Sequence, residues 1–205
     1  MHTSGSAPGI TFRETMAGPF SLGETNPQSG ARKGKADGTT LTIRPLVNID
    51  NLDVFHFDRE HTAQLESSVH FPQLFGETEP TGTGIFNLFA PQGNTRLKLM
   101  KYAFEFSHDN QPYFFYGEKK VEDDPGPDVW QDTTTLFSTL HQGHDRSAPI
   151  IGAGTLRISL TGFLRQLMTM EVTHSESRID KLSAYLFFAN FFLKELRDTY
   201  FRKRK

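Results

Sequence analysis

Short segments that alternate apolar and polar residues run through most of this 205-residue chain. Residues that favour turns separate these segments roughly every 8 to 15 positions, a spacing typical of β-sandwiches and β-barrels. The clearest pair is 97–106 and 113–121, which the turn-forming residues Asp109-Asn110-Gln111-Pro112 join. We therefore predict an all-β fold: a sandwich or partly open barrel of about eight to ten strands, with one long C-terminal helix.

The first 40 residues are predicted to contain a disordered start, the first strand of a β domain and a loop. We predict that residues 1–9 are disordered and that a β domain spans residues 10–176. In the first strand, 10–22, the alternation puts Ile10, Phe12 and Glu14 on one face, and Gly18-Pro19 predicts a kink or an end. Residues 23–38 are rich in glycine and carry basic residues, which predicts a long flexible loop.

Residues 177–205 are expected to form a helix with a basic tail, packed on the β domain or appended to it. The helix itself should run from about Arg178 to Tyr200. Its two apolar stripes are wider than one sheet surface normally covers. The first stripe comprises Ile179, Leu182, Leu186, Ala189, Leu193, Leu196 and Tyr200, and the second comprises Phe187, Phe188, Phe191 and Phe192.

Nineteen phenylalanines accompany only one tryptophan and five tyrosines. Phenylalanine has no polar group, so these rings need burial in a core, a ligand cavity or a partner surface. The net charge of −2 argues against nucleic-acid binding. The sequence contains no cysteine, no signal peptide and no apolar run long enough to cross a membrane, so we expect a soluble, cytoplasmic protein.

Two groups of residues near the N-terminal half could carry chemistry. His56, Asp58 and His61 are of the types that bind Zn²⁺ or Fe²⁺, but neither a helix nor a strand brings all three to one face, which favours a polar loop. Glu14, on an inward strand face, could be an acid with a raised pKa, although pairing with an arginine such as Arg44 or Arg157 is the favoured interpretation.

A second group surrounds two prolines. Its four carboxylates could bind Ca²⁺, but aspartates also suit turns, and the turn interpretation is favoured. Trp130 beside this turn could stack on a ligand or fill the core. The carboxylates belong to Asp123, Asp124, Asp128 and Asp132. We predict no catalytic residue, no cofactor and no bound metal.

Several segments resemble the accessory, non-flavin region of cholesterol-oxidase-like proteins of the glucose-methanol-choline oxidoreductase family. The most specific segment is W-x-D-T-T-T-L, from Trp130 to Leu136. The resemblance implies an association with flavoenzymes or lipid metabolism. It implies no oxidoreductase activity, because Gly82-Thr83-Gly84 lacks the third glycine of a dinucleotide-binding loop. The other similar segments are 12–18, 84–89, 100–106, 117–121, 123–129 and 154–170.

These observations predict a non-catalytic accessory module associated with lipid or sterol metabolism, which docks on a partner enzyme through apolar surface. The partner would be a flavin oxidoreductase or another lipid-handling enzyme, and a homo-oligomer is left open. The alternatives are a carrier or sensor of a sterol or fatty acid in a cavity of the β domain, and an enzyme of unrecognised class. The expected contact residues are Trp130, Phe187, Phe188, Phe191 and Phe192.

Overall fold

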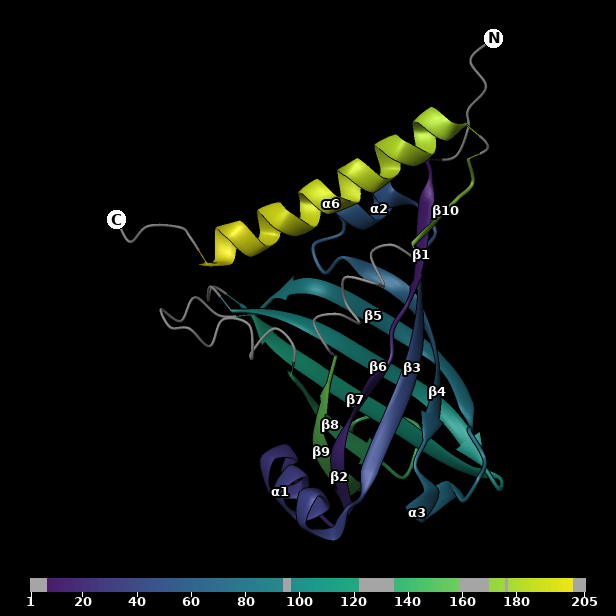
Figure 1. The fold of residues 1–205 in the computed structure, drawn as a ribbon, viewed down its shortest axis with the longest axis vertical. Helices are drawn as coiled ribbons and strands as arrows, with labels where there is room; N and C mark the ends of the chain where they lie inside the picture. Colours follow the sequence, from purple (N-terminus) through teal and green to yellow (C-terminus); the bar gives the residue numbers. More distant parts are fainter. Residues whose placement is uncertain (1–6, 94–96, 122–134, 159–169, 176, 201–205) are drawn as a thin grey trace.

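A computed structural model describes residues 7–93, 97–121, 135–158, 170–175 and 177–200 of the chain (Figure 1). Strands dominate it, and a single long helix follows them (Figure 1). The strands are β1 (Gly9–Arg13), β2 (Met16–Leu22), β3 (Thr40–Ile49), β4 (Thr62–His70), β5 (Thr81–Pro91), β6 (Lys98–His108), β7 (Gln111–Val121), β8 (Thr135–His141), β9 (Ile150–Arg157) and β10 (Glu171–Thr173). The helices are α1 (Pro27–Asp37), α2 (Leu52–Phe57), α3 (Pro72–Phe75) and α6 (Arg178–Tyr200).

The ten strands form one antiparallel sheet in the order β10-β1-β3-β2-β9-β8-β7-β6-β5-β4. An additional pairing of β3 with β4 closes eight of them, β2 to β9, into a barrel. β1 continues the line of β2 past the rim and pairs with β10 (Figure 1). The all-β prediction with a long C-terminal helix is therefore confirmed, and the barrel is closed.

The gap between β1 and β2 lies opposite a proline of β3. Pro45 of β3 lies opposite the gap, between the pairs Arg13–Leu46 and Met16–Ile43. The Glu14 amide donates a hydrogen bond of 2.8 Å to the Pro45 carbonyl oxygen, but proline has no N–H to return one. The predicted break at Gly18-Pro19 is wrong, because both residues lie within β2.

The segment predicted to be a flexible loop contains helix α1, so that prediction is wrong. Asn26 caps the helix by accepting hydrogen bonds from the Gln28 and Ser29 amides, and Gly38 ends it with φ 69°. Its buried residues are Gly30 and Gly34 rather than large apolar side chains. A Cβ at Gly30 would lie 2.0 Å from the Ala153 carbonyl oxygen, so only glycine permits this contact with β9.

Helix α6 lies across one end of the barrel, with α2 beside it (Figure 1). The rings of Phe188 and Phe191 are buried there, and Phe191 lies edge-on to Phe55 of α2. Lys98 of β6 forms an ion pair with Glu195 of α6. In the part of the chain that the structure describes, no helix is long and apolar enough to cross a membrane.

Candidate functional site

Three polar side chains form a hydrogen-bonded chain inside the barrel. The Tyr102 hydroxyl donates to the Glu14 carboxylate over 2.7 Å, and the Lys119 ammonium donates to the Tyr102 oxygen over 3.4 Å. All three are buried, with exposed fractions of 8% for Glu14, 1% for Tyr102 and 3% for Lys119. The ammonium also lies 5.2 Å from the centre of the Tyr102 ring. We call Glu14, Tyr102 and Lys119 the polar triad.

The sheet register explains how residues distant in sequence meet. Alternation along β6 and β7 places Tyr102 and Lys119 on the inner face of the barrel. Tyr102 pairs with Gly117, two residues before Lys119, so their side chains are diagonal neighbours. Glu14 reaches Tyr102 from the gap between β1 and β2, which lies across the barrel from β6 in the strand order. The hydrogen bond between them therefore crosses the interior.

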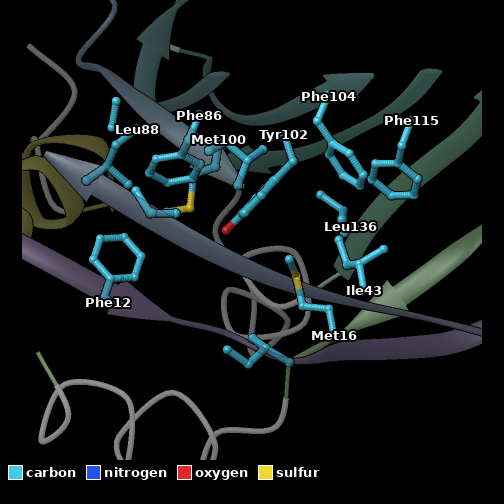
Figure 2. Close-up of a cluster of buried hydrophobic side chains, with 14 of the residues drawn as sticks. Phe12, Met16, Ile43, Phe86, Leu88, Met100, Tyr102, Phe104, Phe115 and Leu136 are labelled. Carbon is cyan, nitrogen blue, oxygen red and sulfur yellow. The ribbon is translucent and has the colours of Figure 1, made fainter. Parts of the chain in front are cut away.

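Apolar side chains surround the triad, and Figure 2 shows Tyr102 pointing into the interior among them. They come from strands on both sides of the barrel and are buried. Residues of this wall include Met16, Ile43, Phe86, Met100, Phe104, Phe115 and Leu136.

The surroundings shift the pKa values of Lys119 and Tyr102. Burial lowers the pKa of Lys119, and the Glu14 carboxylate partly offsets that effect. Burial also raises the pKa of Tyr102 well above its usual value, with Glu14 adding to the shift. An acid and a base together carry no net charge, whether both are ionised or both are neutral. The triad therefore offers both hydrogen-bond donors and acceptors in an apolar interior.

Aromatic rings connect the triad to helix α6. The Phe86 ring lies 4.8 Å from the Tyr102 ring and 6.1 Å from Phe12 of β1. Phe12 in turn lies 6.3 Å from Phe188 of α6. Phe191 contacts His61 at 4.9 Å. The helix that covers the barrel end and the polar triad therefore belong to one continuous cluster of rings.

The predicted contact residues are in different environments. Phe188 and Phe191 are buried, and Phe192 is partly buried, with its ring 5.2 Å from Phe89. Phe187 is exposed and lies edge-on to His56. Trp130 lies outside the described residues, as do the four aspartates of the proline-containing turn.

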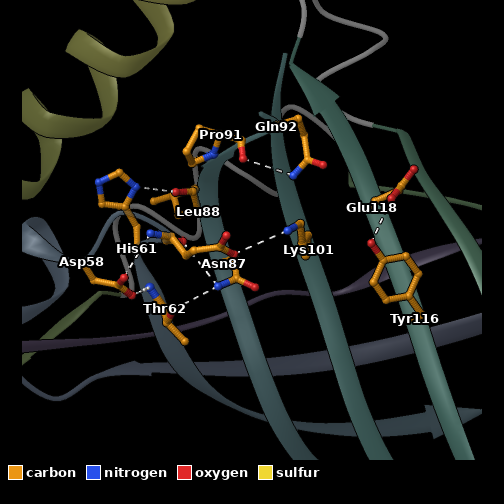
Figure 3. Close-up of polar contacts among 11 residues, drawn as sticks. Asp58, His61, Thr62, Asn87, Leu88, Pro91, Gln92, Lys101, Tyr116 and Glu118 are labelled. Carbon is orange, nitrogen blue, oxygen red and sulfur yellow. Dashed lines mark hydrogen bonds and ion pairs between the residues drawn. The ribbon is translucent and has the colours of Figure 1, made fainter. Parts of the chain in front are cut away.

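His56, Asp58 and His61 make separate contacts instead of forming one site. Asp58 accepts hydrogen bonds from the amides of Glu60 and Thr62, and bonding to Thr62 and Glu60 holds the pKa of its carboxyl below the usual value (Figure 3). The His61 ring donates its Nδ1 proton to the Leu88 carbonyl oxygen over 2.9 Å, and burial lowers its pKa. Among the described residues, no group of three or more His, Asp or Glu side chains could bind a metal.

Neither Arg44 nor Arg157, the two arginines suggested by the sequence, is the partner of Glu14. Arg44 forms an ion pair of 2.5 Å with Glu79, and Arg157 is exposed. Sequence reasoning missed Tyr102 and Lys119 altogether. The available signal was the alternation of β7, in which Lys119 occupies a position on the same face as Tyr113 and Phe115. A lysine at an inward position of a β-strand is unusual enough to indicate a special role.

A second buried tyrosine lies on the outside of the barrel. The Tyr116 hydroxyl donates to Glu118 over 2.9 Å (Figure 3), and the Arg146 guanidinium covers its ring at 3.6 Å. Burial, with the Glu118 carboxylate, raises the pKa of Tyr116 from 10.0 to about 12. This group faces away from the polar triad, since neighbouring residues of a strand point to opposite faces. Tyr116→Phe is therefore a matched control for Tyr102→Phe.

Comparison with family models, curated proteins and solved structures finds no significant match to this chain. The resemblance to the accessory region of cholesterol-oxidase-like proteins therefore stays a prediction.

Proposed function

We propose that the chain is a binding protein for a hydrophobic small molecule that carries one uncharged polar group. In this proposal the polar triad contacts the polar group, and the aromatic wall of the barrel contacts the apolar body. The observation that carries it is the buried triad itself. A barrel that needed only a stable core would be better served by apolar side chains at these positions, because removing polar and ionisable groups from water costs free energy even when they are hydrogen-bonded.

The number of strands in the barrel is compatible with one small ligand. Eight strands enclose an interior that is either filled by side chains or wide enough for one small molecule. Burying an aromatic or aliphatic group contributes roughly 1.5–3 kcal/mol, so a few such contacts give a micromolar dissociation constant, equivalent to about −8 kcal/mol. Phe188 and Phe191 of α6 would contact a ligand that enters at this end, because their rings continue into the cluster that reaches Tyr102.

The charge of the triad favours a hydroxyl or carbonyl over a carboxylate. A bound carboxylate would bring a further negative charge beside the Glu14 carboxylate in an apolar interior, which costs free energy. A sterol or fatty alcohol adds no charge and can both donate to Glu14 and accept from Tyr102 or Lys119. Within the carrier hypothesis, we therefore favour a sterol or fatty alcohol over a fatty acid.

Competition measured by native mass spectrometry tests this proposal. The chain is incubated with equimolar cholesterol, hexadecanol and palmitate, and the bound species is identified from its mass. We expect a one-to-one complex with cholesterol or hexadecanol. Tyr102→Phe, which removes only a hydroxyl, should lower the affinity about tenfold, the equivalent of one neutral hydrogen bond. The double variant Glu14→Gln/Lys119→Met should also bind less tightly.

The controls carry the same chemical changes outside the barrel. Tyr116→Phe removes a buried hydroxyl from the outer face, and Lys120→Met removes an exposed ammonium next to Lys119. Both should bind as the unchanged chain does. Preferential binding of palmitate, or equal effects of Tyr102→Phe and Tyr116→Phe, would count against the proposal.

A second candidate function is docking on a partner enzyme, and one surface favours it. Val54 and Phe57 of α2 are exposed, and His56 lies between Phe57 and the exposed Phe187 of α6. The resemblance suggests a flavin oxidoreductase or another lipid-handling enzyme as the partner. Co-elution of flavin absorbance with the purified chain would support this function if Phe57→Ser abolished it and Leu22→Ser on β2 did not. A chain that elutes as a single species without flavin absorbance would argue against it.

A further inference from the structure

Lys119 differs in its surroundings from every other lysine that the structure describes. Its side chain points into the barrel and is buried, whereas the other described lysines are exposed or half-buried. Lys101, for example, pairs with the exposed Glu60 carboxylate over 3.5 Å. Lysine side chains are rarely buried as completely as Lys119. A desolvated amine of this kind is suited to attack a carbonyl group, because burial favours its neutral, nucleophilic form.

We infer that Lys119 forms an imine with a long-chain aldehyde that binds in the barrel. This inference rests on the proposed function and names one class of its ligand. A fatty aldehyde has the apolar body of a fatty alcohol, and its one uncharged polar group is a carbonyl. Burial lowers the pKa of the Lys119 ammonium, although the Glu14 carboxylate offsets part of the change. More of the neutral amine is therefore present at neutral pH than in an exposed lysine.

Lys119 lies near the end of the barrel that helix α6 covers. In the sheet register it pairs with Met100, which is on the same inner face as Tyr102 (Figure 2). Two residues before Met100, the Lys98 ammonium pairs with Glu195 of α6. Two residues of a strand span about 7 Å, so the amine is close to this end. An aldehyde that enters there carbonyl first would bring its carbonyl to Lys119 and leave its alkyl chain towards the buried rings of α6.

Imine formation needs only the amine and the aldehyde. The lone pair of the neutral Lys119 nitrogen forms a C–N bond to the carbonyl carbon, and one proton moves from the nitrogen to the oxygen. The C–O bond of this intermediate then breaks, and a C=N bond forms. The oxygen leaves as water with the second proton of the nitrogen. One water is released and neither reactant is oxidised or reduced, so no further reactant is required.

Tyr102 is placed to relay these protons. Its oxygen accepts a hydrogen bond from Lys119 over 3.4 Å, and its hydroxyl donates to Glu14 over 2.7 Å. Burial raises the pKa of Tyr102, so its hydroxyl keeps its proton at neutral pH. Tyr102 can take a proton from the attacking nitrogen while passing its own to the Glu14 carboxylate, and the reverse transfer protonates the departing oxygen. The apolar wall keeps water from the imine and thus slows its hydrolysis.

Reductive trapping locates the imine. The full chain is incubated at neutral pH with one equivalent of hexadecanal and sodium cyanoborohydride, which reduces an imine to a stable amine. Peptide mapping by mass spectrometry then identifies the labelled residue in the unchanged chain. We expect one hexadecyl group, on Lys119. Lys120→Met, which removes the exposed neighbour, should be labelled as strongly, and Lys119→Met should lose the label. No labelling, or labelling of exposed lysines such as Lys33 at least as strong as that of Lys119, would overturn the inference.

The rate of imine formation tests the relay. The absorption of all-trans-retinal changes when its aldehyde becomes an imine, so the reaction can be followed without a reductant. At saturating retinal, Tyr102→Phe should slow the absorbance change at least about tenfold, the lower part of the range for a positioned acid or base. Tyr116→Phe, the matched change on the outer face, should react as the unchanged chain does. Equal rates for the two variants would overturn the assignment of Tyr102 as the relay.

Hexadecanol separates failure of this inference from failure of the proposed function. Excess hexadecanol should reduce the labelling of Lys119 by hexadecanal, because both occupy the same site. Binding of hexadecanol inside the barrel with no labelling of Lys119 by hexadecanal would overturn the inference and leave the proposed function standing. Labelling of Lys119 by hexadecanal without any binding of hexadecanol would support the inference and count against the proposed hydroxyl ligand.

Discussion

At the scale of single residues, Pro45 and Glu14 show how a proline in a β-ladder positions a functional group. Because Pro45 cannot donate, the opposite strand is interrupted at Glu14 and Thr15, and the Glu14 carboxylate reaches Tyr102 across the interior. The inward position of Glu14 could be predicted from the alternation of Ile10 and Phe12. Its partner could not be, because Tyr102 is 88 positions away and only barrel closure brings the two together.

The first prediction concerns the coupling of Glu14 and Lys119. Both side chains bond to Tyr102 in a buried site, and the Glu14 carboxylate offsets part of the fall in the pKa of Lys119, so Glu14→Gln or Lys119→Met should each cost about 1–3 kcal/mol of unfolding free energy. The double variant should cost less than either single one. Urea unfolding of the four chains measures this, with Lys120→Met as a surface control expected within about 0.5 kcal/mol of the unchanged chain. Additive losses would show that the two residues are independent.

The second prediction concerns Tyr116. Its pKa is about 12 in the folded chain and 10.0 when exposed, so the folded state retains a proton that the unfolded state loses between these values. The stabilisation is present below pH 10 and is lost as the pH rises towards 12. Tyr116→Phe should therefore lose less stability over this range, measured by unfolding at a series of pH values. An identical pH profile for both chains would contradict the assigned shift.

At the scale of elements, the sequence pattern predicted strands better than the short helix α1. Alternation identified β6 and β7, whereas α1 buries only Gly30 and Gly34 and so lacks the apolar period by which helices are recognised. For α6 the sequence shows two apolar stripes, but it does not show which of them faces the barrel. The Phe stripe packs there because Phe12, Phe55 and Phe89 offer aromatic partners at that end.

The third prediction tests the glycine contact of α1. Alanine normally stabilises a helix by about 1 kcal/mol relative to glycine. Gly30→Ala should nevertheless destabilise the chain, because the new Cβ would lie 2.0 Å from the Ala153 carbonyl oxygen. Thermal melting compares it with Gln28→Ala, an exposed change in the same helix, which should have little effect. A higher melting temperature for Gly30→Ala would mean that α1 does not pack closely on β9.

The fourth prediction concerns the C-terminal helix. Deleting residues 177–205 removes Phe188 and Phe191 from the core cluster and exposes the rings of Phe12 and Phe55. We expect aggregation or a large fall in melting temperature, seen by light scattering and calorimetry. Phe188→Ser alone should reproduce part of the fall in melting temperature. Leu193→Ser, at an exposed position of α6, should leave the melting temperature unchanged. A truncated chain that stays soluble with unchanged melting would show that α6 is an independent appendage.

At the scale of the whole molecule, helix α6 joins the end of the barrel to its interior. The buried rings of α6 complete an aromatic cluster that leads to the polar triad. The fold class followed from strand spacing, but closure depends on the pairing of β3 with β4, which no local pattern reveals. The triad is similarly a product of the closed barrel rather than of any motif.

Photoaffinity labelling tests the central claim most directly, because it locates the ligand. The chain is irradiated with a hexadecanol that carries a diazirine on its alkyl chain, and labelled peptides are identified by mass spectrometry. The account predicts labels on inward-facing residues such as Met16, Met100 and Phe115, reduced by Tyr102→Phe and by excess unlabelled hexadecanol. Labels confined to exposed residues such as Phe57 and Leu193, with none inside the barrel, would contradict it.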